Sequence, residues 1–582
     1  MMRALAALLI ALFAAQALAQ SGATSSDTRA LPALPGLSED EKPGGLTGAD
    51  APPRAAERRG GGATFNWRSV VFDGSTLFDD AALTAVIADL MTGAATLTDL
   101  EIARTRLTRF YVDAGYVNSG ALLPAQNVAG GTVRFDIIEG RLKEVRPLGA
   151  AIGLEFGPGG QLHPDYVTDR LTIDAEKPLN VEELRRKFGQ LLEDPMIARL
   201  DGRLLPGANP GEAFLDLEVE PVKPFALAVS LNNEHSVSNG AFGVDADAQI
   251  RNLTGRGDFT DISLTATEGR QSATVRFDLP FMAGDLRPFV EASYSRSEVV
   301  ESPFDELDIT NRFASFAVGA RWRVWRDDVN SFTLIGSLEH KRSRTRLLGL
   351  PFPAVGTDSD VNSANIIRFA QEYVRREPQQ VLALRSAFSL GLPVLGATRS
   401  EDPIDETDMT SSNDFADGSF FSWLGQLQYS RRIDQNVRLV ARAQAQWSNA
   451  PLLSFEKIGI GGVDTVRGYR HNAITRDIAF LGTLELPVLA ANLPIPGLTG
   501  GDGIAPLTIA PFIDYGVGWN NGKGSRATEH LLGAGLTATY RPNDVITANL
   551  TYGFPFTDGP DGLGGGDLTD EAIYFNVTFN VF

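Results

Sequence analysis

An arginine and an aspartate far apart in the chain are placed to form a buried ion pair. Arg467 lies in a long stretch without the alternation of a strand. Asp514 lies in a segment whose odd positions are apolar, so its even positions should face away from the apolar side. We expect the loop to bring Arg467 within charge-assisted hydrogen-bonding distance of Asp514, with small residues making room. The two motifs are Val466, Arg467, Gly468 and Tyr469 in the loop, and Phe512, Asp514 and Gly516 in the strand.

No set of residues has the spacing of a catalytic or metal site. The 5 histidines include no pair at ligand spacing, and none lies in a nucleophile elbow. The sequence has no cysteine, which excludes disulfides, thiolate metal sites and a cysteine nucleophile. The glycine runs at 60–62 and 564–566 lack the lysine and helix of a phosphate-binding loop. We therefore predict a protein that is not an enzyme and that uses no metal or cofactor.

The charge and the first residues indicate export rather than nucleic-acid binding. A formal net charge of -20 argues against a surface that replaces phosphate counterions. Arg3, an apolar run and small residues at 17 and 19 form the pattern of a secretory signal peptide over residues 1–19. No later segment has the roughly 18 apolar residues of a membrane helix, so a membrane span after export has to be a closed barrel.

A flexible lead and two small α/β modules should follow the signal peptide. Residues 20–64 are rich in glycine, proline and charge, which favours a flexible lead. The pattern over 65–141 predicts strand, helix, helix, strand, strand, with a second helix that opens at a capping box of Thr98 and Glu101. A second copy over 142–222 has helices near 164–171 and 181–192, the latter preceded by Asn180.

Residues 223–582 should form a transmembrane β-barrel of sixteen strands. Alternating segments recur through this region, such as 437–447, with an apolar face ending in Trp447 and a polar face that includes Arg438 and Gln446. A soluble sandwich would show the same alternation. The even number of segments, their membrane-spanning length and the aromatic residues near their ends favour a barrel. The predicted fold is thus mostly β, with the barrel preceded by two periplasmic modules.

These features together resemble the outer-membrane transporters of two-partner secretion, the haemolysin and filamentous-haemagglutinin transporter family. The modules resemble POTRA domains, the arginine motif falls between the eleventh and twelfth strands, and the aspartate motif is on the thirteenth. The resemblance covers residues 65–582. A further match is the turn after the first hairpin, formed by Asn252, Gly255, Gly257 and Asp258.

The resemblance implies a location and a set of partners. The barrel would lie in the outer membrane of a Gram-negative bacterium, with its modules in the periplasm. The modules would receive an unfolded exoprotein, a large β-helical adhesin or haemolysin, and the barrel would conduct it to the cell surface. The loop over about 451–475 would fold into the lumen. Outer-membrane lipid and the barrel-assembly machinery would be the other partners.

Two features depart from the family pattern. The family often has an N-terminal helix that plugs the barrel, whereas residues 20–64 are rich in glycine and proline. The chain ends in Phe582, which is out of register with the apolar face of the last strand that holds Phe579.

Two other functions remain open from the sequence. A barrel-assembly insertase of the same superfamily shares the loop and strand motifs, but a typical insertase has more POTRA modules. A passive porin would not need two folded periplasmic modules.

Overall fold

The computed structural model describes twelve parts of the chain: residues 44–48, 64–91, 93–148, 162–171, 174, 176–281, 285–353, 359–400, 415–500, 503–521, 528–559 and 567–581. The predicted signal peptide, most of the predicted lead and Phe582 lie outside these residues. The chain divides into two compact units. One contains 224–251 and 258–582, and the other contains 40–223 and 252–257.

The first module is a small α/β fold with its own apolar core. It contains β2 (Thr64–Trp67), β3 (Ser69–Asp73), α2 (Asp80–Ile87), η2 (Ala88–Leu90), β4 (Gly93–Thr96), α3 (Leu97–Asp113), β5 (Gly120–Leu122) and β6 (Thr132–Ile138). The strands form a sheet in the order β3-β6-β5 and a separate pair of β2 with β4. The helices bury Leu83, Ile87 and Leu107 in a core with Val133 and Phe135.

The start of α3 differs from the predicted capping box. Thr96 is the N-cap, and its hydroxyl and backbone exchange hydrogen bonds with Asp99. Glu101 instead pairs with Arg104, with 2.9 Å between its Oε2 and the arginine Nε. The pairs Thr96 with Asp99 and Thr98 with Glu101 both have the spacing of a capping box, and the helix begins at the earlier pair.

The second module repeats this plan around one larger sheet. It contains β7 (Arg141–Leu148), α4 (Pro164–Leu171), α5 (Val181–Leu192), β8 (Ile197–Pro206) and β9 (Glu212–Pro221). The two helices have the predicted bounds, and the Asn180 side chain accepts hydrogen bonds from Glu182 N and Glu183 N at the start of α5. This capping satisfies two of the helix's unpaired N–H groups.

Part of the predicted flexible lead is an ordered strand. Residues Gly44–Thr47 form β1, which pairs in parallel with β8 and extends the sheet to β1-β8-β9-β7. A Cβ on Gly44 would stand 2.0 Å from Leu200 O, so the close pairing requires glycine there. The prediction of a lead without structure was wrong for these residues, because a four-residue strand can take its stability from the edge of an existing sheet.

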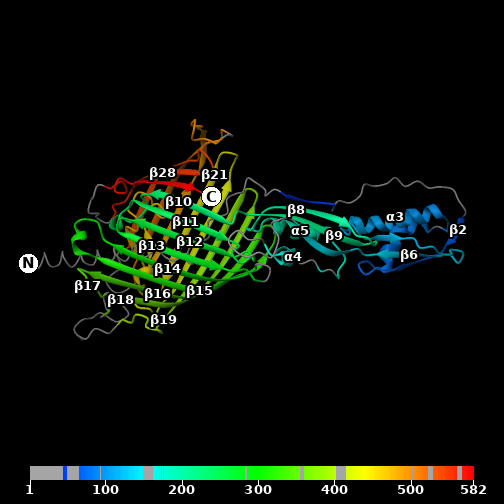
Figure 1. Ribbon diagram of the computed structural model, residues 1–582, viewed down its shortest axis with the longest axis horizontal. Helices are drawn as coiled ribbons and strands as arrows, with labels where there is room; N and C mark the ends of the chain where they lie inside the picture. Colours follow the sequence, from blue (N-terminus) through cyan, green and yellow to red (C-terminus); the bar gives the residue numbers. More distant parts are fainter. Residues whose placement is uncertain are drawn as a thin grey trace, which may run out of the picture. The chain divides into compact units, whose positions relative to one another are not determined.

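Most of the remaining strands close into a barrel (Figure 1). In chain order its sixteen long described strands are β10 (Phe225–Asn232), β11 (Gly243–Arg251), β12 (Phe259–Thr267), β13 (Arg270–Asp278), β14 (Leu286–Glu298), β15 (Thr310–Arg326), β16 (Asn330–Leu347), β18 (Val361–Glu377), β19 (Gln380–Leu392), β20 (Phe421–Arg432), β21 (Arg438–Ser448), β24 (Ile478–Glu485), β26 (Pro506–Trp519), β27 (Glu529–Tyr540), β28 (Ile546–Pro555) and β29 (Ile573–Asn580). Short strands β17 (Leu350–Pro351) and β25 (Val488–Asn492) add to its ends. Strand β29 pairs with β10, with Phe579 opposite Val229, so the sheet has no free edge and a sandwich is excluded.

The two faces of the barrel strands differ in polarity as predicted. On β21, Trp447 is exposed on the outer side whereas Gln446 is buried on the inner side. On β26, Ile513 and Tyr515 are exposed whereas Asp514 is fully buried. This arrangement suits lipid outside and a polar lumen inside. Among the described residues no helix is long and apolar enough to cross a membrane.

Candidate functional site

A single loop between β21 and β24 packs against the inner wall of the barrel. It contains η7 (Ser454–Glu456) and a two-stranded hairpin of β22 (Ile458–Ile460) and β23 (Ile474–Arg476). Ile460 and Val466 in this loop are fully buried, and they share an apolar cluster with Leu481 of β24 and Leu531 of β27. The loop therefore has a core of its own against the inner wall.

The loop and the wall meet at Arg467 and Asp514. The Arg467 Nε donates to Asp514 Oδ2 at 2.7 Å, and its Nη2 donates to Oδ1 at 2.9 Å. The Arg467 backbone N–H also donates to Oδ2, at 3.0 Å. The guanidinium lies over the Phe512 ring, 3.4 Å from its centroid. The two hydrogen bonds fix the orientation of the Arg467 guanidinium as well as pairing its charge, and the Phe512 ring covers one face of it.

Glycines on three neighbouring strands give the loop room to approach. A Cβ on Gly516 of β26 would lie 2.5 Å from Ile460 Cγ2, and one on Gly533 of β27 would lie 1.9 Å from Arg467 O. A Cβ on Gly553 of β28 would lie 2.4 Å from Gly468 N. Gly468 itself has φ +104°, which other residues rarely adopt. The sequence indicated the space beside Asp514, whereas the glycines of β27 and β28 were not singled out.

Two tyrosine hydroxyls hold the end of the arginine motif. Tyr574 of β29 donates to Tyr469 O at 2.6 Å and accepts from Gly468 N at 3.2 Å. The Tyr469 hydroxyl lies 2.9 Å from Leu532 O and accepts from Thr557 N at 3.1 Å. These bonds satisfy backbone groups that a buried loop would otherwise leave unpaired. Tyr574 was not predicted, although the alternation of β29 places it on the lumen side.

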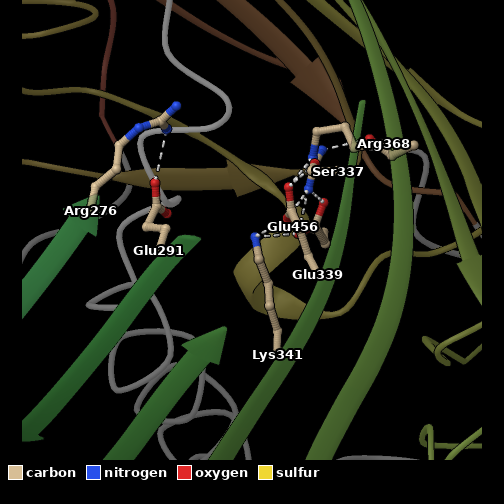
Figure 2. A network of polar contacts seen from close by, with 8 residues as sticks. Arg276, Glu291, Ser337, Glu339, Lys341, Arg368 and Glu456 are labelled. Carbon is tan, nitrogen blue, oxygen red and sulfur yellow. Dashed lines mark hydrogen bonds and ion pairs between the residues drawn. The ribbon is translucent and has the colours of Figure 1, made fainter. Parts of the chain in front are cut away.

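The start of the loop is held by a second buried ionic network, which it forms with residues of β16 and β18 (Figure 2). Glu456 Oε1 accepts from Lys341 Nζ at 2.8 Å, and Glu456 Oε2 lies 3.4 Å from Arg368 Nη2. Arg368 also binds Glu339 in bidentate fashion, with both distances 3.0 Å. The side chains of all four are at most 3% exposed. Two cations and two carboxylates make the cluster neutral, which is the condition for burying charges.

This network was not predicted from the sequence. Glu339 and Lys341 are on β16 and Arg368 is on β18, and the alternation of these strands places all three on the lumen face. The alternation of the strands is therefore enough to predict that these three side chains face the lumen. It does not show which of the many carboxylates in the loop would pair with them.

A third contact ties the loop to two other loops. Arg470 Nη1 donates to Glu301 Oε1 at 2.7 Å, and Arg470 Nε donates to Asp570. Glu301 lies between β14 and β15, and Asp570 lies just before β29. The hydrogen bond to Asp570, with further help from Glu301, raises the pKa of Arg470 above its ordinary value. The loop is thus fastened to walls and loops around much of the barrel circumference.

The other residues predicted for the site lie elsewhere. Asn252 accepts from Gly257 N at 3.0 Å inside the turn between β11 and β12. Gly255 O accepts from His163 N at 2.9 Å, and a Cβ on Gly257 would lie 2.3 Å from Tyr166, so this turn packs on the second module, with which it forms one compact unit. Asp258, next to the turn, is fully buried. Phe579 lies in the closing strand β29, and none of these residues contributes to the lumenal loop.

The described residues offer no metal centre. They contain no group of three or more histidine, aspartate or glutamate side chains that could hold a metal ion. The charged groups around the loop are instead paired with one another. These ion pairs hold the loop in position.

The chain is similar to known proteins over most of its length. The model of the family "Haemolysin secretion/activation protein ShlB/FhaC/HecB" matches residues 211–540, and that of the ShlB-type POTRA domain matches residues 65–140. The outer membrane transporter CdiB of Dickeya dadantii is 21% identical over 516 residues, which cover 87% of this chain and 85% of that protein. The heme/hemopexin transporter protein HuxB of Haemophilus influenzae is 21% identical over 440 residues, which cover 72% of this chain and 70% of that protein.

Two solved structures show the same fold. CdiB from Escherichia coli has a TM-score of 0.61 at 20% identity, over 91% of this chain and 92% of that chain. BamA from Haemophilus ducreyi lacking POTRA domains 1–3 has a TM-score of 0.50 at 12% identity, over 89% of this chain and 100% of that chain.

Proposed function

Since the chain belongs to the haemolysin secretion/activation family ShlB/FhaC/HecB, we propose a route by which it exports its partner exoprotein. The chain is an outer-membrane transporter of two-partner secretion with its POTRA modules in the periplasm, and it is not an enzyme. We infer that the partner is a large β-helical adhesin or haemolysin, which the modules receive in unfolded form.

Capture of the partner uses the sheet edges of the modules. An exposed edge strand can bind an extended chain through main-chain hydrogen bonds, largely independently of side chains. The pairing of β1 with β8 supports this mode, because it shows that an edge of the second module accepts an added strand. In the first module, β3 and β5 are the edges of the three-stranded sheet.

The lumenal loop is then a fixed part of the channel wall. The buried bidentate contact of Arg467 with Asp514 is the observation that carries this proposal. With its loop seated, the lumen presents a defined polar surface to the passing chain. Folding of the partner outside the cell drives export, because the periplasm supplies no ATP.

Mass spectrometry of culture supernatants tests the function. A strain that lacks the gene should lose one large secreted protein, while other outer-membrane barrels stay at their normal levels. Re-expression of the intact chain should restore that protein. If many barrel proteins fall together and no single secreted protein is lost, the chain is an assembly insertase.

A further inference from the structure

Five arginines form a patch on the outer face of strands β14, β15 and β16. Arg296, Arg312 and Arg344 stand directly opposite one another across the three strands. Arg342 and Arg346 flank Arg344 on the same face of β16, two residues before and after it. All five side chains are exposed or half-buried. We call these five residues the arginine patch.

The patch is at the extracellular end of the barrel. Strand β10 begins at Phe225, shortly after the second module ends, so its first residues lie on the periplasmic side. The following strands alternate in direction. The end of β14, the start of β15 and the end of β16 are therefore on the cell surface.

The arginine patch lies directly above the lipid-facing band. On its face of β15, Phe316 is 52% exposed and Trp322 is 49% exposed, as expected of lipid-facing side chains. Trp322 is near the periplasmic end of β15 and is taken as the lower edge of the apolar band. Arg312 is ten positions from Trp322, which is about 33 Å along a strand. At a strand tilt of about 40° this is about 25 Å along the barrel axis, the usual height of the apolar band. The arginines are thus level with the headgroups of the outer leaflet.

The patch has few partners within the protein. Among the described residues, only Arg344 of the five has an ion pair, with 3.4 Å from its Nε to Asp360 Oδ2. Like charges directly opposite one another on neighbouring strands are destabilising. Elsewhere on the barrel, the outward positions at the extracellular ends of β20, β21 and β26 hold aromatic residues, namely Phe421, Trp447 and Trp519.

We propose that the arginine patch binds the phosphate groups of an anionic lipid in the outer leaflet of the membrane. Guanidinium groups bind phosphate in a bidentate manner, and clustered basic side chains at a membrane surface attract anionic headgroups. The phosphates neutralise the row of like charges, while the acyl chains cover Phe316 and the apolar side chains below it. The lipid fixes β14, β15 and β16 in the membrane at the side that carries Lys341 and Glu339 on its inner face.

Lipid titration of the purified full-length protein tests this site. Native mass spectrometry in detergent would count the adducts of lipid A and of dephosphorylated lipid A. The test variant is Arg296→Gln, Arg312→Gln and Arg344→Gln together. A matched control replaces three exposed arginines at the periplasmic ends of strands, Arg376→Gln, Arg431→Gln and Arg438→Gln. Heat-modifiable migration in electrophoresis confirms that each variant is a folded barrel.

The wild type and the control variant should bind lipid A at least tenfold more tightly than its dephosphorylated form. The test variant should lose this difference, and inorganic phosphate at the same concentration should not displace the lipid. Equal binding of both lipids by the wild type, or unchanged discrimination by the test variant, would overturn the proposal. Displacement by inorganic phosphate would show a free-anion site and would equally refute a lipid site.

Discussion

Replacement of Glu456 by glutamine should release the start of the lumenal loop from the barrel wall. The substitution keeps the shape but removes one negative charge from a cluster of two cations and two carboxylates. Lys341 and Arg368 would then share Glu339 alone, which leaves one uncompensated positive charge among side chains that are at most 3% exposed. Removal of one partner of a buried pair costs about 3 to 5 kcal/mol.

Hydrogen exchange can measure this release. The Leu452 N–H donates to Asp477 Oδ1 at 2.9 Å, and the Glu456 N–H donates to Leu453 O at 2.8 Å, so both amides are protected while the loop is seated. Exchange through local opening reports the free energy of that opening. Since about 1.4 kcal/mol corresponds to a factor of ten, these amides should exchange at least about 100-fold faster in Glu456→Gln.

A matched control tests whether the effect requires that the lost carboxylate be buried. Glu529→Gln removes a carboxylate that pairs with Arg476 of the same loop, but the Glu529 side chain is 41% exposed. Exposed pairs contribute about 0 to 1 kcal/mol, so exchange at Leu452 should hardly change in this variant. If Glu456→Gln leaves the exchange of Leu452 and Glu456 as slow as in the wild type, the network does not hold the loop.

Three further perturbations have defined outcomes. Gly533→Ala places a methyl group 1.9 Å from Arg467 O, so the loop should be displaced and become cleavable by added protease while the barrel stays folded. Burial lowers the pKa of His471 below its ordinary 6.5, so His471 binds a proton more readily when the loop is unseated, and the seated state loses stability as pH falls below 6.5. Ion conductance in planar bilayers should therefore change on acidification. The variant His471→Gln should abolish that change. Deletion of residues 65–141 should abolish partner binding in a pull-down while conductance remains, and retained binding would show that the first module is not the receptor.

The periodic parts of the fold could be predicted from the sequence. The alternation of β26 predicted which way Asp514 points, and the arginine of the loop motif at 466–469 was its predicted partner. The bounds of α4 and α5 followed from their apolar period and from the cap at Asn180. These signals are local, so neighbouring residues suffice to show them.

The parts that were missed depend on distant or competing partners. Glu456 meets Lys341 and Arg368 across long stretches of chain, and nothing near Glu456 indicates which strands it will touch. Strand β1 is too short to show alternation, and it exists because β8 offers an edge. Thr96 with Asp99 and Thr98 with Glu101 both have the spacing of a capping box, and the helix uses only the first pair.

The most direct test of the seated loop compares two arginine variants in a strain that lacks the wild-type gene. Arg467→Ala removes the buried contact of the loop with Asp514, whereas Arg476→Ala removes a contact of the same loop with the half-exposed Glu529 of β27. The amount of partner protein in the supernatant should fall at least tenfold in Arg467→Ala and stay near the wild-type level in Arg476→Ala, with both barrels folded in the outer membrane. Export at the wild-type level by Arg467→Ala would contradict the requirement for a seated loop.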